Sequence, residues 1–145
     1  MFNKFFIKKK KENIDNKGIL LTALLIHAAK IDENYTNAEK EIIKKAIINL
    51  NIVESDKVEE LIKQAEKKEQ DSNQIIDFTK EIKKNPMNYR IKIIEILWKI
   101  VYSDGTSDGY ESNLIRRVCS LLYVSDKDSG AIKLKIQNSK FKKIK

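Results

Sequence analysis

Two short acidic segments contain the residues of this chain whose types and spacing could bind an ion. Asp32 is followed seven residues later by Glu39, and Asp104 is followed seven residues later by Glu111. The two pairs are related by an offset of 72 residues, and each lies between two segments with a helical apolar pattern. Carboxylates that return at a fixed offset between such segments predict a repeated helix–loop–helix unit with a candidate site in each connection.

The same offset aligns residues 24–53 with residues 96–125. Five of the thirty aligned positions are identical: the two carboxylate pairs, and Leu25 with Leu97, Ile43 with Ile115 and Leu50 with Leu122. Because the identities fall on apolar flanking positions and on the connections, they favour a pseudo-twofold internal repeat.

The second loop begins like an EF-hand calcium loop, with oxygen side chains at Asp104, Thr106 and Asp108 followed by Gly109. The first loop follows this pattern more weakly, through Asp32, Asn34, Thr36 and Asn37. An EF-hand also needs a bidentate Glu at its twelfth position, where these loops have Ile115 and Ile43, so neither is an EF-hand.

The remaining arrangement is shorter and places Glu39 and Glu111 one turn into the following helix, where each could turn back toward its loop. Oxygen ligands without His or Cys suit Ca²⁺, Mg²⁺ or Mn²⁺. The spacing therefore makes the loop oxygens, with Glu39 and Glu111 turned toward them, the candidate ligands. No organic cofactor is expected.

Helix capping explains part of the same pattern without a metal. Thr36-x-x-Glu39 and Asp108-x-x-Glu111 are capping pairs, and a carboxylate in the first turn of a helix contributes up to about 1 kcal/mol. Capping alone does not explain Asp32 and Asp104. The residues by themselves leave cation binding and loop architecture both open.

Composition indicates the elements that position these loops. The 145 residues are 41% apolar and include only four Gly and one Pro, which predicts an all-α single-domain bundle of about seven helices. We expect helices over about 19–31, 37–50, 56–69, 72–83, 86–101, 110–122 and from Ser125 onward, with Asn85 as a cap and Pro86 at a first position. The helix over 86–101 is the most apolar, so it is expected to be central.

The net charge of +8 comes from the two ends of the chain. Residues 1–11 contain five Lys and residues 133–145 contain six, both without acids, so the part between them carries −3. We therefore expect a basic and apolar tail over 1–17, a helical domain over 18–136 and a Lys-rich tail over 137–145. The tails could be solvated, or the first could contact an anionic membrane surface. No motif predicts specific nucleic-acid binding.

Cysteine and histidine usage argues against several chemistries. A single Cys119 cannot form an intramolecular disulfide, which favours a cytoplasmic protein, with peripheral association at the inner membrane face as an alternative. Cys119 also aligns with Ile47 on an apolar stripe, which predicts a buried thiol. His27 has no second His to complete a metal site, so a packed histidine is expected. Without an identifiable nucleophile or phosphate-binding glycine loop, the chain is not expected to be an enzyme.

Three segments resemble the TerB-like domain, a family named for tellurite resistance and also found at the N-terminus of the co-chaperone DjlA. They are LLIHAAKIDENYTNAEKEII, FTKEIK and LWKIVYSDGTSDGYESNLIRRVCSLL, the last with an Asp-Gly-x-x-Asp-x-x-Glu core, and the resemblance covers Gly18 to Leu134. It implies an all-helical bundle and an acidic surface at the two loops that binds divalent cations. Carried over by position, the metal ligands that the resemblance implies are Asp32, Glu39, Asp104, Asp108 and Glu111. It further implies a non-enzymatic module that contacts an unidentified protein partner in a stress-response or envelope-associated assembly. Glu33 and Thr36 depart from the family pattern, in place of Gly and Asp.

Overall fold

A computed structural model describes residues 15–31, 35–72, 74–102 and 109–144, with side chains except at 109–112 and 139–144. This part contains helices and no strand, which confirms the all-α prediction. The α-helices are α2 (Asn16–Lys30), α3 (Asn37–Asn49), α4 (Val58–Asp71), α5 (Ile76–Thr79), α6 (Met87–Val101), α7 (Gly109–Leu121) and α8 (Asp126–Ile144). Two short 3-10 helices, η1 (Ser55–Lys57) and η2 (Ile82–Lys84), precede α4 and α6.

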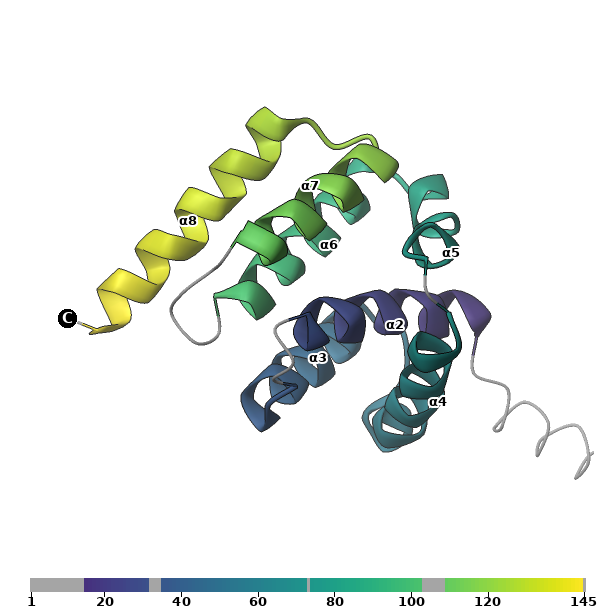
Figure 1. The fold of residues 1–145 in the computed structure, drawn as a ribbon. Helices are drawn as coiled ribbons and strands as arrows, with labels where there is room; N and C mark the ends of the chain where they lie inside the picture. Colours follow the sequence, from purple (N-terminus) through teal and green to yellow (C-terminus); the bar gives the residue numbers. More distant parts are fainter. Residues whose placement is uncertain (1–14, 32–34, 73, 103–108, 145) are drawn as a thin grey trace, which may run out of the picture.

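The helices form two groups joined through α2. Figure 1 shows α2 with α3 and α4 in one group, α6, α7 and α8 in the other, and the short α5 between them. α2 contacts α3, α4, α5 and α6, and ten of its fifteen residues are buried, against six of fifteen in α6. α6, which was expected to be the central helix, also contacts four helices, namely α2, α3, α7 and α8, but α2 is the more buried of the two.

The helices α3 and α7 begin and end at positions related by the 72-residue offset. Both close with a Schellman motif: Ile52 N–H donates to the Ile47 carbonyl at 3.1 Å, and Val124 N–H donates to the Cys119 carbonyl at 2.8 Å. The residue before each donor has a positive φ, 57° at Asn51 and 58° at Tyr123. The local geometry of these two helix ends is therefore the same, while the pseudo-twofold relation of the whole halves stays a prediction.

The left-handed backbone at Tyr123 gives a direct stability prediction. Tyr123 is 70% exposed, so its ring contributes little packing, whereas a non-glycine residue at positive φ is strained. Tyr123→Gly should raise the free energy of unfolding by about 1 kcal/mol in urea titrations. Asn51→Gly is the matched control and should change it by only a few tenths, because Asn tolerates this conformation. A loss of stability in Tyr123→Gly would contradict the strain argument.

The predicted helix over residues 72–83 is interrupted. α5 ends at Thr79 and η2 begins at Ile82, although the apolar stripe expected there is buried at Ile75, Thr79 and Ile82. The predicted stripe of Ile75, Ile76, Thr79 and Ile82 is buried except at Ile76, which is 51% exposed, and the expected continuous helix was wrong. Pro86 disfavours helical backbone at the residue before it, so the chain tightens into a 3-10 turn before reaching it.

Asn85 closes η2 rather than opening α6. Its Nδ2 donates to the carbonyls of Glu81 and Ile82 at 3.2 and 3.0 Å, and Pro86 takes the N-cap position of α6. The assignment of Asn85 as the cap of the following helix was therefore wrong. The same two carbonyls accept the backbone N–H groups of Lys84 and Asn85, so the side-chain amide adds a second hydrogen bond to each.

Two further contacts fix the second group of helices. Arg90 of α6 donates to the carbonyl of Asn85 at 2.9 Å and to that of Leu122, just after α7, at 2.7 Å. The Ser125 hydroxyl accepts from Asp128 N–H at 3.1 Å, as expected for the start of α8. α8 continues to Ile144, beyond residue 136 at which the helical domain was predicted to end. The predicted domain limits themselves stay predictions.

Candidate functional site

The structure describes only one of the five predicted ligand side chains. Asp32, Asp104 and Asp108 lie outside the described residues, and Glu111 is in the first turn of α7 with its side chain outside them. Glu39, in the first turn of α3, is fully described. The cation site as a whole therefore stays a prediction, and only the base of the first loop can be built from contacts.

Glu39 forms a complete capping box with Thr36. Its Oε1 accepts from the backbone N–H of Thr36 at 2.8 Å and from the Thr36 hydroxyl at 3.0 Å, while Glu39 N–H donates to Thr36 Oγ1 at 3.2 Å. The residue is only 5% exposed. The carboxylate is thus fixed at the positive end of α3, where the helix dipole favours it. The predicted capping pair is confirmed at this loop.

Next to this loop, a cluster of ionisable side chains joins α2 to α4. Glu69 accepts from Lys30 Nζ at 2.7 Å through Oε1 and from His27 Nδ1 at 3.0 Å through Oε2. The His27 ring also lies 6.2 Å, centroid to centroid, from the Phe78 ring. His27 is therefore a packed residue with an acidic partner, as expected, and the imidazole donates through Nδ1 in this contact.

Glu69 is nearly buried, and its contacts determine its charge. Burial alone would raise the pKa of its carboxyl, but the hydrogen bonds from Lys30 and His27 outweigh burial and hold the pKa below its ordinary value. Sequence reasoning missed this residue. Glu69 continues the apolar stripe of α4 one turn after Ala65, and an acid at a stripe position is the signal that could have indicated a buried partner.

Tyr35 connects the first loop to the same cluster. Its hydroxyl oxygen is buried and makes no hydrogen bond within the described residues, although the nearby Glu66 carboxylate acts on it electrostatically. Burial, and then Glu66, raises the pKa of this hydroxyl. Lys40 lies 4.8 Å above the Tyr35 ring and 3.9 Å from Glu66. The end of the first loop is thus held against α4 by ring, cation and carboxylate contacts.

The only cysteine lies in the second group of helices and is structural. Cys119 is buried, and burial raises the pKa of its thiol. Next to it, Trp98 Nε1 donates to the Ser129 hydroxyl at 3.1 Å, which joins α6 to α8. These contacts confirm the predicted buried thiol.

Among residues 15–31, 35–72, 74–102 and 113–138, no three His, Cys, Asp or Glu side chains are grouped so as to hold a metal ion. The described helices are also each too short or too polar to cross a membrane. The candidate ion-binding oxygens therefore remain those of the two loops.

The fold and the loops define a small all-helical bundle with two acidic helix connections. The family model described as tellurite resistance protein TerB matches residues 19–134, close to the Gly18 to Leu134 span of the predicted resemblance. The chain therefore belongs to the TerB family. No curated protein and no solved structure matches it significantly.

Proposed function

We propose that this chain is a non-enzymatic TerB module that binds divalent cations at its two acidic loops and mediates protein contacts. The candidate ligands are Asp32 and Glu39 in the first loop, and Asp104, Asp108 and Glu111 in the second. The family match, which spans both loops, is the observation that carries this proposal. The role in a stress-response or envelope-associated assembly rests on the family alone, which is not a family of known enzymes.

The contacts between Thr36 and Glu39 support a prepared position for a cation. Because Thr36 and the start of α3 fix the Glu39 carboxylate, a cation at the loop would not have to order this side chain. Glu111 occupies the corresponding position in the first turn of α7, at the same 72-residue offset. A carboxylate at the base of each loop and oxygen side chains within it suit Ca²⁺, Mg²⁺ or Mn²⁺.

Calorimetric titration of the full chain with these three ions, at physiological ionic strength, tests the proposal. We expect saturable binding, and a variant carrying Asp104→Asn and Glu111→Gln should lose the part that belongs to the second loop. A control variant with Glu54→Gln and Asp71→Asn removes the same charge from exposed positions outside the loops, and it should bind as the wild type does. If both variants lose cation binding equally, the binding depends on overall charge and not on the loops.

The alternative is an architectural role for the acidic loops, and the Glu39 capping box favours it at the first loop. Under this alternative the carboxylates stabilise helix ends and a protein partner binds without any ion. Absence of binding heat, together with an unchanged melting temperature in millimolar metal, would reject the cation proposal and support the scaffold.

Contact of the basic tails with an anionic membrane is a separate alternative. Residues 1–11 lie outside the described part, so only their composition supports it. Flotation with phosphatidylserine vesicles tests it: salt-sensitive binding that disappears when residues 1–11 are deleted would establish this role.

A further inference from the structure

A groove between α3 and α6 presents apolar side chains that the fold leaves partly uncovered. It has a volume of about 370 Å³ and joins the two groups of helices. Its floor includes Ile42, Ala46 and Leu50, one helical turn apart on α3, and Ile96 on α6. Ile42, Leu50 and Ile96 are all half-buried at the margin of the core. The floor extends for about 12 Å along α3, the length of roughly two helical turns.

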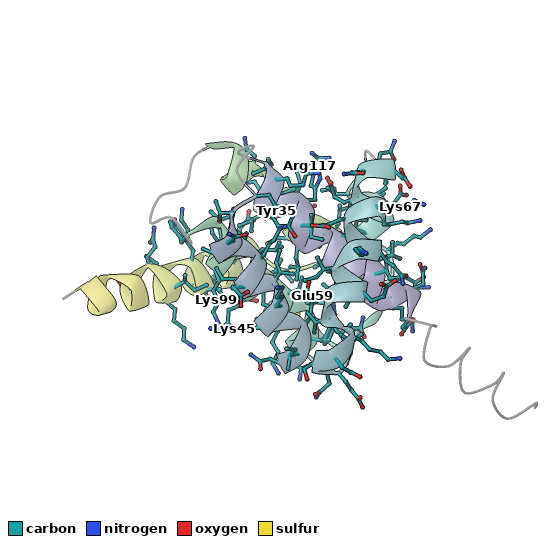
Figure 2. The ribbon with its side chains drawn as sticks, turned by 90° about the horizontal axis from the view of Figure 1, so that it is seen from below. Tyr35, Lys45, Glu59, Lys67, Lys99 and Arg117 are labelled. Atoms are coloured by element: carbon teal, nitrogen blue, oxygen red, sulfur yellow. The ribbon has the colours of Figure 1, made fainter. Side chains whose placement is uncertain are left out.

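Lysines surround this floor. Lys45 of α3 and Lys92 and Lys99 of α6 line the groove and are exposed, and Glu95 is the one acidic side chain among the described residues that line it. Glu95 lies 3.5 Å from Lys99 and so offsets one of the three positive charges. Within the described residues, Lys45 and Lys92 have no ion-pair partner. Figure 2 shows Lys45 and Lys99 close together on this face, with Glu59 and Lys67 toward α4.

The other side of α3 has a different charge arrangement. Lys44 lies 2.8 Å from Glu59 of α4, and Lys40 pairs with Glu66 of the same helix. The fold therefore neutralises the α3 lysines that face α4 and leaves a net positive rim at the α3–α6 groove. This contrast is notable in a folded region whose net charge is negative.

We propose that the α3–α6 groove binds an acidic amphipathic helix of a partner protein. Apolar residues at i and i+4 of such a helix would cover Ile42, Ala46 and Ile96, and flanking carboxylates would meet Lys45 and Lys92. The positive rim of the groove is complementary to carboxylates, and its apolar floor is complementary to apolar side chains, so a helix that carries both fits it. A nucleic acid would contact the lysines but leave the floor uncovered, since no aromatic side chain lines the groove for base stacking. The proposal is independent of cation binding at the loops.

Fluorescence anisotropy of the full chain with a labelled acidic peptide tests this inference. The peptide has about three helical turns, with Leu at i, i+4 and i+7 and Glu on both flanks. Binding should weaken about tenfold in a Lys45→Gln, Lys92→Gln variant. Lys63→Gln with Lys67→Gln, exposed lysines on α4, is the charge-matched control and should leave the affinity unchanged. Amide shift changes on peptide addition should centre on Ile42, Ala46 and Ile96.

Several outcomes would overturn the inference. An equal loss of affinity in both lysine variants, or equal binding of a scrambled peptide of the same composition, would leave only nonspecific charge attraction. Shift changes centred away from α3 and α6 would place the peptide elsewhere. Saturable binding of sodium laurate that displaces the peptide, with tighter affinity, would assign the groove to a small anionic amphiphile. Absence of peptide binding at millimolar concentration would reject the proposed occupant.

Discussion

Phe78→Ala is expected to lower the free energy of unfolding by about 3–5 kcal/mol. Phe78 is fully buried and belongs to α5, an element of only four residues that contacts both α2 and α7. Its ring also lies next to His27, beside the Glu69 cluster. Such a short helix has little stability of its own, so the position of this segment depends on the side chains that it buries. Removing the ring should therefore leave a cavity between the two helix groups.

A residue two positions before Phe78 provides the control for this experiment. Ile76 lies in the same short helix but is 51% exposed, so Ile76→Ala should cost less than about 1 kcal/mol in the same urea titrations. Phe78→Leu keeps most of the buried volume and should fall between the two, which preserves a measurable transition if the alanine variant unfolds. Equal effects of Phe78→Ala and Ile76→Ala would contradict the assigned core position.

Glu69→Gln is expected to cost about 1–2 kcal/mol at neutral pH, because it removes the charge that Lys30 and His27 contact. The Glu69 pKa is lower in the folded protein than its ordinary value of 4.5. Its contribution to stability is therefore present above that value and is lost as the pH falls through the folded-state pKa. The difference between wild type and variant should shrink below about pH 4.5.

Unfolding free energies measured from pH 7 down to pH 3 check this dependence. Glu60→Gln on the exposed face of the same helix is the control, and its effect should be small across the range. If the wild type and Glu69→Gln differ by a constant amount at all pH values, the Lys30 and His27 contacts do not act through the Glu69 charge.

Features that depend on neighbouring residues could be predicted from the sequence. Thr36 and Glu39 form the expected capping box, and Ser125 accepts from Asp128 N–H as an N-terminal cap should. Apolar periodicity located the buried faces of most helices, including the stripe of α4. It failed to detect the break after Thr79, because a 3-10 turn keeps nearly the same side-chain spacing over a few residues.

In the candidate site, too, local features could be predicted and contacts between distant segments could not. The two acidic loops and the class of ion came from side-chain type and spacing, and the set of five candidate ligands came from the family resemblance. The described residues confirm only the capping role of Glu39. The Glu69 cluster was not predicted. Its two partners are 42 and 39 residues away in the chain, so no local pattern pairs them.

The sequence by itself determined that this protein is an all-helical TerB domain with acidic helix connections, because helix formation and capping depend on residues within one or two turns. Only the tertiary structure decided that α2 is more buried than α6, that Glu69 meets Lys30 and His27, and that a groove lies between α3 and α6. Several faces of similar apolarity could pack in more than one arrangement, and the arrangement adopted depends on how volumes and charges from distant segments fit together.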